Sequence, residues 1–213
     1  MLSKLTLIAL LPLAFSTAIK KSSDTLNCVQ FQYGGPFTSF GAGGFIHLYS
    51  NVTSFDSSTQ HSDYNETRLG LAEDGTIENC GDCRTTELFG FEVCQNDQRK
   101  GFDGLNGPHA FYGHVTYTNV SPNIQCLTAT KTPYEGASLR LADCQYDYDS
   151  ASTSGQYFEM TVTDGVYHAL LIDEASNFYG PTPELNNNAS LVLYNVVGPN
   201  TTYTYFGFKA PEF

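Results

Sequence analysis

The sequence contains no tryptophan, and it has only 10 lysine and arginine residues against 22 aspartate and glutamate residues, for a formal net charge of −12. An acidic surface of this kind repels phosphate backbones and anionic lipid heads. Nucleic acid is therefore not expected as a partner. Beyond the N-terminus the sequence also lacks an apolar run long enough to cross a bilayer. We therefore expect no membrane attachment of the mature chain.

The sequence lacks the short motifs that mark common catalytic centres, such as G-x-S-x-G, H-E-x-x-H or a P-loop. His109 and His114 are five residues apart, which on a strand places them on opposite faces. The acidic stretch at 147–149 lacks the spacing of a calcium loop. We therefore expect no enzyme activity, no catalytic residue, no metal and no cofactor.

The first 18 residues predict a secretory signal. Lys4 precedes a largely apolar run over 5–15, and three small residues follow at 16–18. This is a short basic region, an apolar core too short for a membrane span and a small-residue cleavage site. We expect cleavage after Ala18 and one domain over residues 19–213, a length that suits a single core.

The six cysteines are an even number, and in an exported chain they predict disulfide bonds. They are Cys28, Cys80, Cys83, Cys94, Cys126 and Cys144. Cys80-Gly-Asp-Cys83 has the C-x-x-C spacing of redox and zinc sites. A zinc site would need a second pair of ligands, and a redox motif would need a strand–helix context, neither of which is visible. Structural bridges are favoured.

Five N-glycosylation sequons occur, at Asn51, Asn65, Asn119, Asn188 and Asn200. Because an exported chain is exposed to N-glycosylation, we expect a glycoprotein with these five segments at its surface.

Helical periodicity is almost absent, and short runs of β-branched and aromatic residues take its place, separated by Gly, Pro, Asn, Asp and Ser. Examples are GFIHLY (44–49), GHVTYTNV (113–120), YFEMTV (157–162) and ASLVLYNVV (189–197). Asp74-Gly75 and Asp164-Gly165 are hairpin-turn signals, because glycine tolerates positive φ. The pattern predicts an all-β chain with many short strands.

Similar blocks recur along the chain. ASLRLADCQYD (137–147) matches ASLVLYNVV (189–197), and GQYFEM (155–160) matches YTYFGF (203–208). Apolar pairs begin at Ile46, Phe91, Leu139 and Leu191, so the spacing runs from 45 to 52 residues. A period of this size, with several strands in each unit, suggests a cyclic β architecture.

The third block resembles the repeat of ricin B-type lectins. The matching residues are Cys126-Leu127-Thr128, Gly136, Leu139-Arg140-Leu141, Cys144 and Gln156-Tyr157-Phe158. The resemblance implies a β-trefoil with long loops, in which three four-strand units surround an axis and rings such as Phe158 and Phe206 meet in the core. Two features depart from the family: there are four candidate centres instead of three, and tryptophan is absent from the last aromatic position. The alternative fold is a β-sandwich.

The same resemblance implies a Cys126–Cys144 disulfide within the repeat. Cys94 would then pair with Cys80 or Cys83, and the other of these two would be left for Cys28.

In ricin B-type lectins a sugar stacks on an aromatic platform and is held by an aspartate that follows Cys-Leu, with polar residues nearby. The corresponding positions here hold Thr128, Arg140, Ala142 and Gly155. None of these offers the carboxylate or the ring, so we predict that the standard site is absent from this repeat.

Two other blocks carry candidates for an atypical carbohydrate site. Tyr49 and His47 follow the first apolar pair, and Tyr194 and Asn195 follow the last. The alternative is that both tyrosines are half-exposed strand residues without a ligand.

Together these patterns predict a secreted, non-catalytic, monomeric glycoprotein that binds extracellular glycans weakly or atypically. One alternative is a trefoil that binds secreted proteins, such as a protease inhibitor acting through the long loops 51–66, 95–110 and 180–190. The other is a cell-wall or secretome component without a small ligand. The short signal, the sequons and the degenerate repeat are together typical of a fungal secreted protein.

Overall fold

A computed structural model describes most of the chain after residue 25. The described residues are 26–30, 32–33, 40–41, 43–56, 61–79, 88–95, 105–106, 110–117, 124–146, 153–163, 166–182, 190–196 and 204–209. Several predicted features lie outside these ranges: the signal 1–18, Cys80, Cys83, His109, and the sequons at Asn119, Asn188 and Asn200. Within the ranges no helix is long and apolar enough to cross a membrane.

The described elements are all strands, which confirms the predicted all-β class. One antiparallel sheet has 14 strands, and β2 (Gln32–Tyr33) and β3 (Phe40–Gly41) form a separate pair. The 14 strands are β1 (Asn27–Gln30), β4 (Gly43–Asp56), β5 (His61–Leu71), β6 (Ile77–Asn79), β7 (Phe89–Gln95), β8 (Leu105–Asn106), β9 (Ala110–Tyr117), β10 (Gln125–Ala129), β11 (Leu139–Asp143), β12 (Phe158–Thr163), β13 (Val166–Ile172), β14 (Phe178–Pro181), β15 (Leu193–Asn195) and β16 (Tyr205–Lys209).

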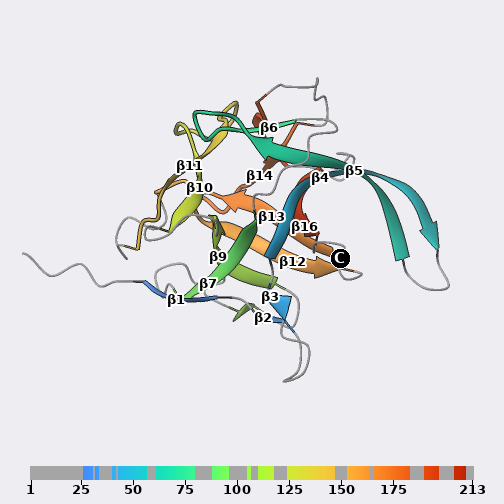
Figure 1. The fold of residues 1–213 in the computed structure, drawn as a ribbon, viewed down its shortest axis with the longest axis horizontal. Helices are drawn as coiled ribbons and strands as arrows, with labels where there is room; N and C mark the ends of the chain where they lie inside the picture. Colours follow the sequence, from blue (N-terminus) through green and yellow to red (C-terminus); the bar gives the residue numbers. More distant parts are fainter. Residues whose placement is uncertain are drawn as a thin grey trace, which may run out of the picture.

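Six strands of this sheet, which we call the ring strands, pair in a cycle. β4 pairs with β7, β7 with β9, β9 with β12, β12 with β13, β13 with β16, and β16 with β4 (Figure 1). The β4–β7 contact has only two registered pairs, Gly43–Gly90 and Gly44–Phe89, so the ring is only partly closed along its length.

Three hairpins lie between the ring strands in the chain order: β5–β6, β10–β11 and β14–β15. The order ring strand, hairpin, ring strand therefore occurs three times. The hairpins also contact one another through three isolated bridges, Thr76–Arg140, Glu78–Ser190 and Ser138–Val192. Each hairpin thus contacts both of the others.

Only two of the four predicted repeat centres occupy equivalent places in this arrangement. Leu139 and Leu191 each directly follow a residue that bridges to another hairpin. The third equivalent residue is Ile77, which sequence comparison missed. Ile46 and Phe91 lie on the ring strands β4 and β7 instead.

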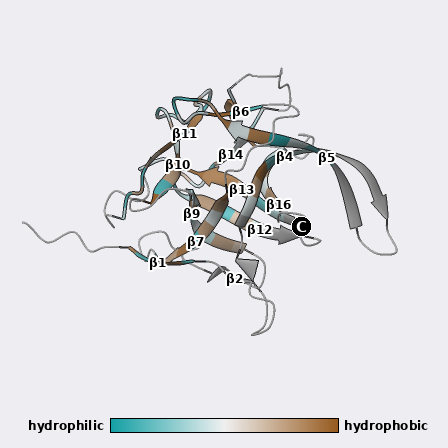
Figure 2. Ribbon diagram, viewed as in Figure 1, coloured by the Kyte–Doolittle hydropathy of each residue, from teal (hydrophilic) through white to brown (hydrophobic). Residues whose placement is uncertain are grey.

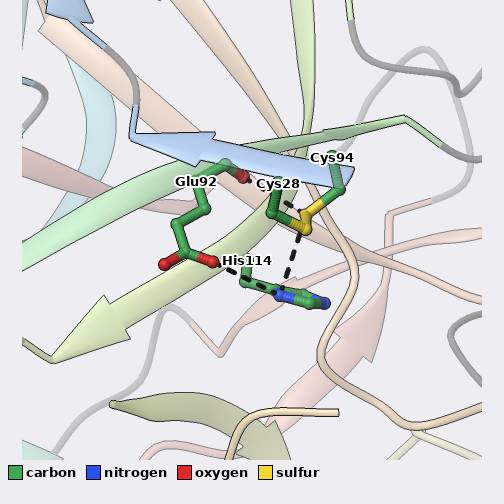
Figure 3. Close-up of side chains that lie close together, drawn as sticks. All are labelled: Cys28, Glu92, Cys94 and His114. Carbon is green, nitrogen blue, oxygen red and sulfur yellow. Dashed lines mark hydrogen bonds and ion pairs between the residues drawn. A yellow bond between two sulfur atoms is a disulfide. The ribbon is translucent and has the colours of Figure 1, made fainter. Parts of the chain in front are cut away.

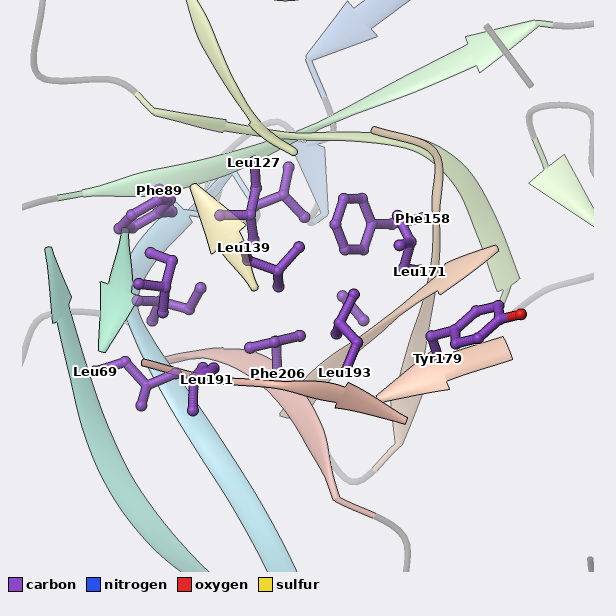
Figure 4. Packing of buried hydrophobic residues seen from close by; sticks show 14 of the residues in the cluster. Leu69, Phe89, Leu127, Leu139, Phe158, Leu171, Tyr179, Leu191, Leu193 and Phe206 are labelled. Atoms are coloured by element: carbon purple, nitrogen blue, oxygen red, sulfur yellow. The ribbon is translucent and has the colours of Figure 1, made fainter. Parts of the chain in front are cut away.

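The main hydrophobic core lies among the ring strands and hairpins (Figures 2 and 4). Phe158 and Phe206 belong to it together, as predicted, and Phe89 on β7 supplies a third ring. All three are fully buried, and burial of such a side chain stabilises a fold by roughly 1.5–3 kcal/mol. Phenylalanine therefore fills the core without a tryptophan N–H that would need a partner.

The hairpin formed by β4 and β5 extends well beyond its contact with the ring (Figure 1). Pairing continues to Asp56–His61, with register shifts between Ser50 and Ser54. The segment 51–66, predicted as a loop, is therefore mostly strand. Predicted glycosylation residues Asn51 and Asn65 both lie on this hairpin, and Asn65 is exposed.

Two disulfide bonds join described cysteines. Cys126 bonds to Cys144, the pairing that the lectin resemblance implied. Cys94 bonds to Cys28, so its predicted pairing with Cys80 or Cys83 is wrong. The reason is the antiparallel register of β1 and β7, which places Cys28 directly opposite Cys94. Disulfide bonds indicate an oxidising environment, such as the extracellular space.

Candidate ligand-binding sites

Polar residues of the block 126–160, whose sequence resembles the lectin repeat, have structural roles. Gln156 donates from Nε2 to Thr128 Oγ1 at 2.9 Å and to the Asp143 carbonyl oxygen at 3.0 Å, and its Oε1 accepts from the Gln145 N–H at 2.8 Å. Thr128 in turn donates to the Cys126 carbonyl oxygen. The glutamine of the family pattern thus ties β10, β11 and the start of β12 together.

The other positions that correspond to the lectin site also offer little to a ligand. Arg140 is exposed and Ala142 is half-buried, without a ring. Gly155 has a φ of 68° and lies so close to Ala129 and Tyr134 that a Cβ would meet both at 3.2–3.3 Å. A larger polar residue at position 155 would therefore be strained.

Tyr49 and His47 lie in the interior, so they present no open face to a sugar. Tyr49 is 1% exposed and His47 is 8% exposed. β4 is paired with another strand along both of its edges, because Tyr49 lies opposite Tyr205 on β16 and opposite Glu66 on β5. Burial, with a smaller contribution from the Glu66 carboxylate, raises the pKa of Tyr49.

Tyr49 packs directly against Gly207 of β16. A Cβ at position 207 would stand 2.3 Å from the Tyr49 ring, so only glycine admits the ring there. A sugar-stacking platform at Tyr49 and His47 therefore does not fit this geometry, because both side chains are buried and their strand, β4, lies between two other strands.

Tyr194 and Asn195 lie on β15 and are half-buried. The Tyr194 hydroxyl is 2.9 Å from Thr204 Oγ1. The Asn195 N–H donates to Glu135 Oε2 at 2.7 Å, whereas Asn195 Oδ1 is buried and makes no hydrogen bond within the described part of the chain. These two residues remain near the surface, in contrast to Tyr49 and His47.

A cavity of about 270 Å³ lies between segments that are distant in the sequence. Its walls come from the β10–β11 loop, the segment before β12 and the turn between β13 and β14. The lining residues are Thr132, Pro133, Tyr134, Thr153, Asp173, Glu174 and Ala175. None of the four predicted carbohydrate-binding residues is among them.

The carboxylate of Asp173 is held firmly at this cavity. It accepts hydrogen bonds from the Asn177 N–H and Nδ2, each at 2.8 Å, and from the Tyr179 hydroxyl at 2.9 Å. Partial burial acts to raise the pKa of Asp173, but these hydrogen bonds outweigh it and lower the pKa. The group is therefore an anionic acceptor at neutral pH.

Two tyrosines connect the cavity to the core. The ring of Tyr179 meets the ring of Tyr134 edge-on, with centroids 5.6 Å apart and an interplanar angle of 83°. Burial, followed by the hydrogen bond to Asp173, raises the pKa of Tyr179 to about 12. Tyr179 also lies opposite Asn195 in the β14–β15 register, and Glu135, which follows Tyr134, bonds to Asn195.

A second cluster, which we call the His114 cluster, comprises Cys28, Glu92, Cys94 and His114 (Figure 3). One potential ligand atom from each of the four residues lies within 4.8 Å of the others. His114 Nδ1 is 3.8 Å from Cys94 Sγ and 4.0 Å from Glu92 Oε2. His114 is fully buried, which lowers its pKa to about 4, so its imidazole is neutral at physiological pH.

Other side chains enclose this cluster. The Tyr146 hydroxyl donates to Glu92 Oε2 at 2.9 Å and Gln30 Nε2 donates to Glu92 Oε1 at 3.1 Å. The rings of Tyr146 and Tyr157 meet the His114 ring edge-on. In the disulfide-bonded state both sulfur atoms are engaged with each other.

Neither site had a signal in the sequence. Pro133 and Tyr134 come from one hairpin loop, and Asp173 comes from another about 40 residues later. In the sequence His114 is distinguished only by its spacing from His109. Comparison of the chain with protein-family models, curated proteins and solved structures finds no match.

Proposed function

We propose that this chain is a secreted, non-catalytic glycoprotein with a β-trefoil fold, and that it binds a carbohydrate in the cavity beside Tyr134. The proposal has two parts, the fold and the site, and they rest on different observations.

The strand order supports the trefoil. Two ring strands with a hairpin between them occur three times, and the three hairpins bridge to one another. Phe89, Phe158 and Phe206, one from the last strand of each unit, are buried in the same core. A β-sandwich would instead stack two sheets face to face, which the cyclic order of the ring strands does not favour.

The cavity is the observation that carries the binding proposal. Apolar C–H faces of a sugar pack on rings such as those of Pro133 and Tyr134, and sugar hydroxyls donate to carboxylates such as Asp173 and Glu174. At about 270 Å³ the cavity is slightly smaller than the range of roughly 300–1,000 Å³ typical of ligand pockets. We therefore expect it to take one sugar ring, with weak affinity.

The cavity replaces Tyr49 and His47 as the candidate site. The pair on β15 keeps a role in the proposal, since the Glu135–Asn195 hydrogen bond places Asn195 beside the cavity loop.

Saturation-transfer NMR with a panel of monosaccharides and disaccharides tests the proposal. Asp173→Asn and Glu174→Gln each remove the negative charge and replace one acceptor oxygen with an NH2 group, and each is expected to weaken binding of any sugar hit by about tenfold, because hydrogen bonds to charged groups contribute roughly 1.5–3 kcal/mol. Glu73→Gln is the matched control, because Glu73 is exposed on the β5–β6 turn. No hit in the panel, or equal binding by all three variants, would rule out the site.

One observation favours a second function, the binding of another protein. The outer part of the β4–β5 hairpin pairs only with itself among the described strands, so it is available to a partner. Inhibition of secreted proteases by the whole protein, abolished when residues 52–64 are replaced by a short turn, would favour this alternative. Glycans at Asn51 and Asn65 would oppose it, because both lie on the same hairpin.

A further inference from the structure

We propose that reduction of the Cys28–Cys94 disulfide converts the His114 cluster into a zinc-binding site with two thiolate ligands, one imidazole and one carboxylate. The four residues come from three strands, β1, β7 and β9, that the sheet brings side by side (Figure 3).

The set of ligands matches the preference of zinc. Zinc binds cysteine sulfur, histidine nitrogen and carboxylate oxygen in tetrahedral sites. In such a site a sulfur and a nitrogen ligand lie about 3.5 Å apart, and a nitrogen and an oxygen ligand about 3.4 Å apart. The corresponding separations here are 3.8 Å for Cys94 Sγ to His114 Nδ1 and 4.0 Å for His114 Nδ1 to Glu92 Oε2. Changes of about half an ångström would bring these two separations to tetrahedral spacing, and all four ligand atoms already lie within 4.8 Å of one another.

The disulfide bond prevents the two sulfur atoms from binding zinc. Two bonded sulfur atoms lie about 2 Å apart, whereas two thiolates on one zinc ion lie about 3.8 Å apart. A dithiol reductant supplies two electrons and two protons, so the protein gains two thiols and the reductant becomes a disulfide. Zinc then displaces the two thiol protons to solvent.

The surroundings already orient the non-sulfur ligands. Tyr146 and Gln30 each donate a hydrogen bond to one oxygen of Glu92, which holds the carboxylate beside the imidazole. His114 directs Nδ1 toward the sulfur atoms, and its Nε2 makes no hydrogen bond within the described residues. The imidazole is neutral, so one ring nitrogen has a lone pair available to a metal, and zinc binding at Nδ1 requires the tautomer with the proton on Nε2.

Access to the cluster is through β1. β1 is an edge strand of the large sheet, and its Cys28 is half-buried whereas Cys94 is fully buried. A reductant therefore reaches the Cys28 sulfur first, and an edge strand moves with less disruption than a ring strand.

The test uses the full mature protein, reduced with dithiothreitol and then freed of it by gel filtration without oxygen. Zinc ion is added, and the thiols are alkylated and mapped by mass spectrometry. We expect zinc to slow alkylation of Cys28 and Cys94 at least tenfold. Cobalt ion in place of zinc is expected to give thiolate-to-metal charge-transfer absorption. The disulfide-bonded protein is expected to show neither effect.

Variants locate the site. His114→Gln and Glu92→Gln are expected to lower the zinc affinity about tenfold or more, whereas His47→Gln, a buried histidine on β4, leaves it unchanged. A Cys80→Ser/Cys83→Ser double variant keeps the protection. The proposal is overturned if zinc protects other cysteines instead, if the His114 and Glu92 variants bind as well as the unmodified chain, or if the reduced chain loses its β structure and zinc does not restore it.

Discussion

At the scale of single residues, tyrosine hydroxyls take the place of scarce basic side chains. With 10 basic residues against 22 acidic ones, most carboxylates have no lysine or arginine to pair with. Among the residues that the structure describes, three carboxylates instead accept a hydrogen bond from a tyrosine. The pairs are Tyr112–Glu159 at 2.6 Å, Tyr146–Glu92 at 2.9 Å and Tyr179–Asp173 at 2.9 Å. An acidic protein thereby keeps partly buried carboxylates hydrogen-bonded without neutralising its charge.

The first prediction concerns one such pair. Tyr146→Phe removes a hydrogen bond from the buried Glu92 carboxylate and should destabilise the fold by about 1–3 kcal/mol. Tyr117→Phe is the control, because that half-buried ring packs on Phe89 and should tolerate loss of its hydroxyl. Urea unfolding at pH 7 measures both variants, and equal midpoints for the two would contradict the prediction.

The second prediction concerns the pH dependence of stability through His114 in the disulfide-bonded protein. Burial lowers its pKa from 6.5 to about 4. Between these values the unfolded chain binds more protons than the native chain, so the free energy of unfolding falls as the pH drops from about 6.5 to about 4. The loss reaches about 3 kcal/mol. The groups that face the ring are the Glu92 carboxylate from β7, the rings of Tyr146 and Tyr157, and the disulfide.

Urea unfolding at a series of pH values checks this. His114→Gln should flatten the decline between pH 6.5 and 4 relative to the unmodified protein. A variant whose stability falls as steeply as before would show that another group is responsible.

At the scale of elements, the sequence predicted strands better than it predicted their partners. The runs 44–49, 113–120 and 157–162 overlap β4, β9 and β12, because alternating or continuous apolar residues mark buried strands locally. The Asp74-Gly75 turn is confirmed, with a φ of 80° at Gly75. Asp164-Gly165 lies outside the described residues.

The pairing of strands and cysteines could not be predicted from the sequence, because it depends on contacts between residues that are far apart in the chain. Cys28 and Cys94 are 66 residues apart, and only the β1–β7 register brings them together. The same applies to the cavity, since the β10–β11 loop that carries Tyr134 and the β13–β14 turn that carries Asp173 meet only after the second and third units pack together. A residue pattern within one short segment cannot specify a contact between segments that are distant in the sequence.

The third prediction concerns the close contact between β9 and β7. A Cβ at Gly113 would stand 1.7 Å from the Glu92 carbonyl oxygen, a backbone atom that a side-chain rotation cannot move. Gly113→Ala should therefore cost more than about 4 kcal/mol or prevent folding. Gly136→Ala is the control, where a φ of 70° but no backbone clash should cost about 1 kcal/mol. Thermal unfolding of both variants measures the difference, and similar costs would show that β9 can shift.

At the scale of the whole molecule, the two described disulfides constrain very different lengths of chain. Cys28–Cys94 spans 66 residues and joins the edge strand to the ring, whereas Cys126–Cys144 spans 18 residues within one unit. Of the three units with the order ring strand, hairpin, ring strand, the one that could be predicted is the second, β9 to β12, where a disulfide and the glutamine pattern mark the repeat. The first unit lacks the repeat pattern because the residue two positions after its hairpin centre, Ile77, is the polar Asn79, whereas Leu139 and Leu191 are each followed by a second leucine.

The fourth prediction compares the two bonds. By the entropy of loop closure, the longer loop should contribute about 4 kcal/mol and the shorter about 3 kcal/mol to stability. Replacing both cysteines of each pair with alanine should therefore destabilise the protein more for Cys28 and Cys94 than for Cys126 and Cys144. Urea unfolding without reductant gives the ranking, and the reverse order would show that packing around the bonds outweighs chain entropy.

The long disulfide also bears on how the protein matures. During synthesis into an oxidising compartment, Cys28 emerges first, and Cys80 and Cys83 both become available before its native partner Cys94. A thiol that meets two wrong partners before the right one forms incorrect bonds that must be exchanged later. Folding of this chain in an oxidising compartment should therefore depend on a disulfide isomerase, and the yield of correctly bonded protein in a host that lacks one should fall sharply.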